Sequence, residues 1–308
     1  MRTVLTMKKL FIALFLLSST WMMSQQAAAV EIAMVLWRGE TPAEKQFVQE
    51  LANLGIKANI QIFNAEQDRG KLGTMLRKDL QPKLGQVDYV YTFGTTVSKV
   101  VKGVINGESV QIFNIVTDPV GADLVANLNQ GQAHINGVTS AVSLERQVEN
   151  ALEMVKVSKV AVPFNPREKN SKLFVDNLKA IGEREGFTVT SYRIRPEDST
   201  LQEDLDAMLA AGNMDAIFMP PDSFLISNAA TIMAKINEKK IPTVCAVKKY
   251  VDEGCLMGTV SDYGELGKMA ARMLHEHMAG KSLNALPVQS DRNAKRILND
   301  TTRAMLGL

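Results

Sequence analysis

Pairs of hydroxyl and carboxylate side chains follow several apolar segments of this sequence. Thr95-Thr96 comes after one such segment, Thr117-Asp118 after a second and Asp222-Ser223 after a third. Hydroxyls and free backbone N–H groups at the start of a helix suit an anionic group, and a carboxylate suits an ammonium. These pairs therefore predict non-covalent binding of a small polar molecule. Their alternative role is to cap helices without touching a ligand.

Residues suited to catalysis are few and poorly spaced for it. The three histidines are His134, His275 and His277, and the last two point to different faces of a predicted helix. No histidine lies close in sequence to either cysteine, and the zinc-protease, nucleophile-elbow and phosphate-loop patterns are missing from the sequence. We therefore expect a binding protein rather than an enzyme, without catalytic residues, cofactor or metal.

Strands and helices alternate in the same order in two halves of the chain. Strand-like apolar segments at 32–36 and 89–93 in the first half correspond to those at 160–162 and 216–219 in the second, and helical patterns separate them. This alternation predicts βαβ units with parallel sheets, so the fold class is α/β with two Rossmann-like lobes.

The chain is expected to cross between the lobes more than once. Lobe 1 would comprise residues 30–140 plus about 259–285, and lobe 2 would comprise 141–258 plus about 286–308. The crossing segments would form a hinge of several strands.

Ligands of open parallel sheets bind beyond the carboxyl ends of the strands. In addition to the three pairs above, this rule selects the loop that begins at Trp37-Arg38 and the loop 164–171. Trp37 or Phe164 is suited to stacking on an apolar or cyclic ligand part. Arg38 is suited to meeting a carboxylate, and the alternative is that it is only solvated. If the lobes face each other, all these loops line one cleft.

The first 29 residues predict an export signal. Three basic residues precede a short apolar run at Leu10–Leu17, and the segment ends in Ala27-Ala28-Ala29. These are the parts of a secretory signal peptide cleaved after Ala29, which predicts a periplasmic protein; an uncleaved anchor is the alternative. Met7 is an alternative start to Met1, because it directly precedes two lysines.

Removing this segment changes the charge balance. The full chain has 35 Lys and Arg residues against 33 Asp and Glu, and without the three basic residues of the segment 32 remain, a net charge near −1. No basic stripe is left to indicate a nucleic-acid partner. The other 279 of the 308 residues suffice for two lobes, each with its own core.

Cys245 and Cys255 are the two cysteines of the sequence, ten residues apart in apolar segments. An oxidising compartment permits a disulfide between them. Two buried free thiols are the alternative.

Several segments in order resemble a known family. They are Thr117-Asp118-Pro119-Val120-Gly121, Asn136-Gly137-Val138-Thr139, Asn165-Pro166 through Asn170-Ser171, and Gly254-Cys255-Leu256-Met257-Gly258 followed by Asp262-Tyr263-Gly264. Together they are similar to the substrate-binding proteins of ABC transporters that include tryptophan- and tyrosine-type binders. The resemblance implies a type I periplasmic-binding-protein fold, with the ligand enclosed between two hinged lobes.

The resemblance also implies binding positions and partners. With Trp37 and Arg38, the candidate ligand-binding residues are Thr95, Thr96, Thr117, Asp118, Asn165, Ser171, Asp222, Ser223 and Asp262. We expect a monomer that captures an amino acid or a similar solute for an ABC permease. A membrane sensor kinase or receptor is the alternative partner. The first loop lacks the acidic-His-Pro pattern of some aromatic-amino-acid binders, so the sequence leaves the ligand open.

Overall fold

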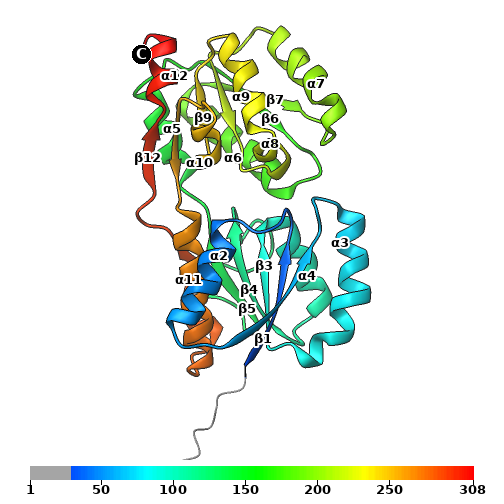
Figure 1. Ribbon diagram of the computed structural model, residues 1–308. Helices are drawn as coiled ribbons and strands as arrows, with labels where there is room; N and C mark the ends of the chain where they lie inside the picture. The colour runs from blue at the N-terminus through cyan, green and yellow to red at the C-terminus, as the bar shows by residue number, and fades with distance from the viewer. Residues whose placement is uncertain (1–28) are drawn as a thin grey trace, which may run out of the picture.

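The computed structural model describes residues 29–308 and has two lobes, one above the other (Figure 1). The predicted signal peptide lies outside the described residues except for Ala29. Each lobe contains a six-stranded sheet with helices on both faces, which confirms the predicted α/β class and two-lobed fold.

The sheet of the first lobe has the strand order β11-β5-β4-β3-β1-β2, and all its paired strands are parallel. The strands are β1 (Val30–Leu36), β2 (Ala58–Asn64), β3 (Tyr89–Phe93), β4 (Val110–Val116), β5 (Ile135–Thr139) and β11 (Gln289–Ser290). Most central-strand residues are buried because helices cover both faces, which explains their nearly continuous apolar runs.

The helices of the first lobe come from both ends of the chain. They are α2 (Pro42–Asn53), α3 (Arg69–Met75) followed by the π-helix η1 (Leu76–Leu80) and the 3₁₀ helix η2 (Gln81–Gln86), α4 (Gly94–Ile105) and α11 (Tyr263–Met278). Thr41 and Glu44 form a capping box that starts α2. Helix α11 lies directly against α2 (Figure 1), and a Cβ on Gly267 would lie 2.0 Å from the Ala43 carbonyl oxygen. Close packing of these helices therefore requires glycine at position 267.

The sheet of the second lobe has the order β12-β10-β9-β8-β6-β7, parallel except for the β10–β12 pair. Its strands are β6 (Lys159–Phe164), β7 (Thr188–Arg193), β8 (Ala216–Met219), β9 (Thr243–Cys245), β10 (Met257–Val260) and β12 (Lys295–Leu298). Its helices are α5 (Leu144–Leu152), α6 (Lys169–Glu185), α7 (Asp198–Ala210), α8 (Ser223–Ser227), α9 (Ala229–Glu238), α10 (Lys248–Asp252) and α12 (Asp300–Leu306). Cys245 and Cys255 are joined by a disulfide, with Cα atoms 6.5 Å apart.

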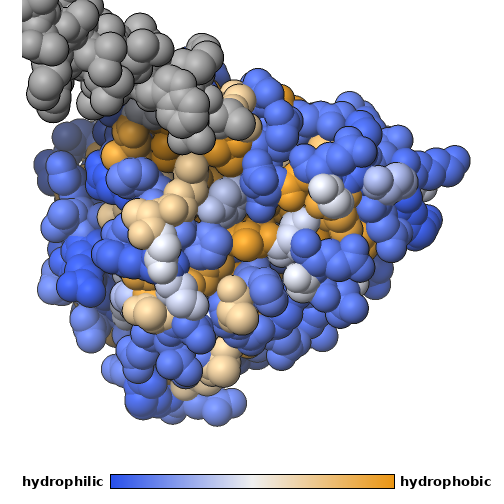
Figure 2. Space-filling view, turned by 90° about the horizontal axis from the view of Figure 1, so that it is seen from below, coloured by the Kyte–Doolittle hydropathy of each residue, from blue (hydrophilic) through white to orange (hydrophobic). Residues whose placement is uncertain are grey.

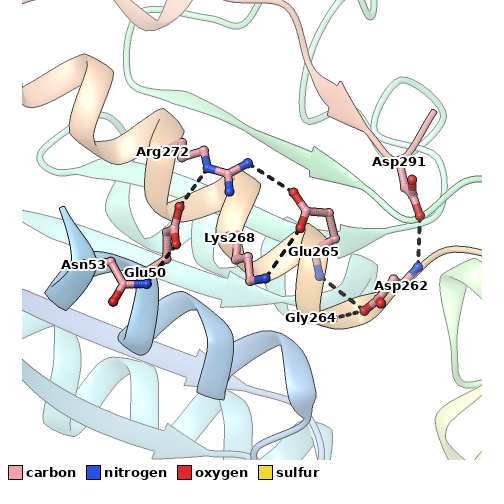
Figure 3. Close-up of polar contacts among 8 residues, drawn as sticks. All are labelled: Glu50, Asn53, Asp262, Gly264, Glu265, Lys268, Arg272 and Asp291. Atoms are coloured by element: carbon pink, nitrogen blue, oxygen red, sulfur yellow. Dashed lines mark hydrogen bonds and ion pairs between the residues drawn. The ribbon is translucent and has the colours of Figure 1, made fainter. Parts of the chain in front are cut away.

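Three segments connect the lobes: 140–143, 261–262 and 291–294. The Ser261 hydroxyl donates to the Ser140 carbonyl oxygen at 3.4 Å, and the Asp262 N–H donates to an Asp291 carboxylate oxygen at 3.0 Å (Figure 3). Because β10 belongs to the second sheet and β11 to the first, the last two crossings lie slightly later in the chain than the expected positions 259 and 286.

The outer face of the first lobe is mainly hydrophilic, with smaller apolar areas between the polar side chains (Figure 2). Within residues 29–308, no helix combines the length and the apolar character needed to span a membrane.

Candidate functional site

An inner pocket lies between the two lobes and is bordered by the hinge. Its lining residues are Trp37, Arg38, Phe93, Gly94, Thr95, Thr96, Ile115 and Thr117 from the first lobe, Glu168, Asn170, Pro221, Ser223 and Ile226 from the second, Ser140 from the hinge, and Tyr263 at the start of α11. About 370 Å³ of space lies among them, part of it open to solvent. The pocket therefore lies where the carboxyl ends of both sheets meet.

The first lobe contributes the amino terminus of α4 to this pocket. Its N-cap position is Phe93, so no described side chain caps the first turn of the helix. Thr96 is only 7% exposed, and its hydroxyl has no hydrogen-bond partner among the described residues. The Thr95 hydroxyl accepts from the Thr117 N–H at 3.4 Å. The helix dipole and these free donors favour an anionic group here.

Arg38 adds a positive charge on the same side. Its guanidinium carbon lies 5.3 Å from the centre of the Phe93 ring. Burial raises the pKa of the Tyr263 hydroxyl, whereas the positive charge of Arg38 lowers it. The buried Nη1 atom has no partner within residues 29–308. A buried, unpaired cationic donor is unfavourable, so Arg38 and Thr96 together would gain from an anionic ligand group.

The second lobe contributes a buried carboxylate, Glu168, at the start of α6. Its oxygens accept from the Ser223 N–H at 3.0 and 3.1 Å, from Asn170 Nδ2 at 3.3 Å, and from Trp37 Nε1 at 3.2 Å. The last contact joins the two lobes. Burial raises the pKa of the Glu168 carboxyl, whereas these donors and the charge of Arg38 lower it.

Asn165, Ser171 and Asp222 form hydrogen bonds that fix the loops around Glu168. Asp222 caps α8 by accepting from the Leu225 N–H at 3.0 Å, and it also accepts from the Asn165 N–H at 3.3 Å. The same Asn165 N–H donates to the Ser171 hydroxyl at 3.2 Å. Burial and the nearby charge of Glu168 raise the pKa of Asp222 to about 8. These side chains hold the loops that carry Glu168 and Ser223.

The structure separates the sequence-predicted residues into two groups. Those that line the inner pocket are Trp37, Arg38, Thr95, Thr96, Thr117 and Ser223. Those placed elsewhere are Asp118, Asn165, Ser171, Asp222 and Asp262.

Besides Asp222, two members of the second group accept from nearby backbone N–H groups. Asp118 accepts from the Gly121 N–H at 2.8 Å and faces a neighbouring groove beside the hinge. Asp262 is exposed and caps α11 through the Gly264 and Glu265 N–H groups (Figure 3).

Sequence reasoning missed Glu168, Asn170 and Tyr263 as individual pocket residues. Glu168 and Asn170 lie within the predicted loop 164–171, but an acid and an amide at a helix start usually face solvent. Tyr263 is the first residue of α11, directly after its N-cap, at the point where the chain returns to the first lobe. This position is the sequence signal that could have identified it.

Comparisons with known proteins agree with this architecture. The family described as ABC transporter substrate binding protein matches residues 34–308. A protein named "Tyrosine-binding protein" from Clostridioides difficile (strain R20291) is 26% identical over 271 residues, covering 86% of this chain and 76% of its own length.

Two solved structures share the fold. An ABC domain from Streptococcus pneumonia in complex with L-Trp has a TM-score of 0.80 and 24% identity, covering 91% of this chain and 95% of its own. A conserved domain protein from Vibrio cholerae has a TM-score of 0.82 and 20% identity at the same coverage.

Proposed function

Because this chain belongs to the ABC transporter substrate binding protein family, which is a family of solute-binding proteins, we propose that it captures an α-amino acid. It would bind the amino acid in the inner pocket and deliver it to a membrane permease. Export to the periplasm would follow from the amino-terminal segment.

One observation carries this proposal: the two walls of the pocket have complementary charges. The first lobe presents Arg38, the Thr96 hydroxyl and the start of α4. The second lobe presents Glu168. A zwitterion would place its carboxylate on the first wall and its ammonium on the second, and each end would form charge-assisted hydrogen bonds.

Binding of such a ligand would couple to closure of the lobes. Glu168 of the second lobe already accepts from Trp37 Nε1 of the first at 3.2 Å. A ligand that contacts both walls binds the closed arrangement better than an open one, so it shifts the population towards closure. A permease would then recognise the closed form.

The relative from Clostridioides difficile supports an amino acid as the ligand class, since its name states that it binds tyrosine. The apolar pocket residues are suited to an amino-acid side chain. These include Phe93, Ile115 and Ile226.

Calorimetry on the chain from Val30 onwards tests the charge complementarity. We expect L-tyrosine to bind, and its analogues tyramine, without the carboxylate, and 3-(4-hydroxyphenyl)propionate, without the amine, to bind at least about 100-fold more weakly. Each analogue leaves one buried wall unpaired. Equal affinity for tyrosine and either analogue would contradict the proposed orientation. If none of the common L-amino acids raises the melting temperature, the amino-acid proposal fails.

Uptake measurements test delivery. Deleting the coding gene in its own host should reduce uptake of the bound amino acid, and a plasmid copy should restore it. A copy carrying Arg38→Leu should restore little uptake. Full uptake without the protein would contradict a transport role.

A further inference from the structure

Ile115 has an unusual backbone conformation for its residue type. Its φ angle is +56°, and it is the only β-branched residue among the six described non-glycine residues with positive φ. The left-handed region places Cβ close to the following carbonyl oxygen, which disfavours a branched side chain most strongly. Ile115 also lies inside a strand, β4, rather than in a turn.

A bulge in β4 creates this conformation. The pairing of β4 with β5 shifts register between Phe113 and Val116, so Ile115 falls in the irregular step. Its N–H donates to the side-chain oxygen of the neighbouring Asn114 at 2.9 Å. The bulge therefore takes Ile115 out of the regular ladder, and Asn114 supplies the missing acceptor.

A chain of buried hydrogen bonds holds Asn114 in place. Asn114 Nδ2 donates to the Tyr91 hydroxyl at 2.9 Å, and that hydroxyl donates to Glu44 Oε1 at 2.6 Å. Glu44 is in turn fixed by the capping box of α2. The surrounding first lobe thus determines the strained conformation.

The strain has a function only if the side chain of Ile115 is needed, because glycine adopts positive φ at almost no cost. Ile115 lines the inner pocket beside Phe93 and is 6% exposed. We infer that Ile115 is a specificity-determining residue, whose side chain limits the size of the apolar ligand group that the pocket accepts. This inference rests on the proposed amino-acid function.

Affinities of L-alanine, L-leucine, L-tyrosine and L-tryptophan for the wild type and for Ile115→Gly test the size limit. Removing four carbons from the pocket wall should lower the ratio of the L-tryptophan to the L-alanine dissociation constant at least about tenfold. Ile115→Val should retain the wild-type ratio. A merely structural role would weaken all four ligands alike and leave the ratio unchanged.

Melting temperatures test the strain separately. At ordinary φ an alanine variant is more stable than a glycine variant, but at positive φ the order reverses. We expect Ile115→Gly to melt about 2 °C or more above Ile115→Ala. The neighbouring Val116, fully buried in the same strand and without positive φ, provides the matched control: Val116→Ala should melt above Val116→Gly.

The outcomes separate the two proposals. The inference alone is overturned if the wild type and Ile115→Gly have the same ratio of L-tryptophan to L-alanine dissociation constants. It is also overturned if Ile115→Ala melts at a higher temperature than Ile115→Gly. If Ile115→Gly binds one of these amino acids and the wild type binds none, the proposed amino-acid function is overturned, but the size limit set by Ile115 is supported. If neither protein binds any of the four, both proposals fail.

Discussion

Glu44 and Glu168 are two buried glutamates, one in each lobe, and each lies near the start of a helix. Glu44 lies in the first turn of α2 and Glu168 at the N-cap of α6, and both are almost fully buried. Burial raises the pKa of each carboxyl. They differ in where their hydrogen-bond donors come from.

All the donors to Glu44 belong to its own lobe. The Thr41 N–H and hydroxyl donate to Oε2 at 2.7 Å, and the Tyr91 hydroxyl donates to Oε1. Glu168, by contrast, lines the pocket and accepts from Trp37 across the cleft. Glu44 therefore stabilises one lobe, whereas Glu168 is available to a ligand and to closure. Burial and a raised pKa alone do not distinguish these roles.

Of the substitutions that test the difference between these two glutamates, the one at Glu168 should have the largest effect, a loss of ligand affinity. Glu168→Gln removes the negative charge and replaces one acceptor oxygen by an NH2 donor that faces the surrounding N–H donors. Affinity for L-tyrosine should therefore fall about 100-fold or more. Calorimetry measures this loss. Glu50→Gln is the matched control, because Glu50 pairs with Arg272 on the surface of α2 and α11 (Figure 3). Equal losses in both variants would contradict a ligand role for Glu168.

The next effect is on stability. Glu44→Leu keeps the side-chain volume but removes the carboxylate, so the O–H of Tyr91 and the N–H of Thr41 lose their acceptor. We expect the free energy of unfolding to fall by about 2–4 kcal/mol. Thermal unfolding should show a decrease of at least about 5 °C. A decrease below 1 °C would mean that the hydrogen bonds of Glu44 are not needed for the first lobe.

Asp222 of the second lobe should make a contribution of its own to the pH dependence of stability. Asp222 has a pKa of about 8 in the folded protein and about 4 when unfolded. Between these values the folded state holds a proton that the unfolded chain has lost. Stability should therefore fall as pH rises from about 4 to 8, and level off above.

Melting temperatures from pH 5 to 8 measure this slope. Asp222→Asn should reduce it, since one such group accounts for about 1.4 kcal/mol per pH unit. Asp206→Asn changes an exposed acid of the same lobe and should keep the wild-type slope. A wild-type melting temperature that rises over this interval would contradict the raised pKa.

Much of the fold could be predicted because parallel strands have a distinctive sequence. The five residues of β3 are all buried, and the helix that follows directly begins with Gly94 and the polar Thr95-Thr96 pair. Local sequence therefore suffices to place Thr96 at a carboxyl edge of the sheet. The predicted fold class and family were confirmed.

The rest of the site depends on contacts that are distant in sequence. Glu168 is buried because Trp37, 131 residues away, and the Ser223 loop cover it. Asp222 follows a strand as expected, but α8 begins immediately after it, so its carboxylate caps that helix instead of lining the pocket. The positive φ of Ile115 arises from the β4–β5 pairing and has no local sequence signal.

The smallest effect concerns the cross-lobe contact itself. Trp37→Phe retains an aromatic ring but removes the N–H that donates to Glu168, so the closed arrangement loses one hydrogen bond to a carboxylate while the ligand contacts of Glu168 remain. Affinity for L-tyrosine should fall about tenfold. Gln67→Ala removes a second cross-lobe contact, the exposed 3.4 Å hydrogen bond to Ser227, and should change affinity less than about threefold. If both variants weaken binding equally, closure depends on the number of contacts between the lobes and not on the buried carboxylate of Glu168.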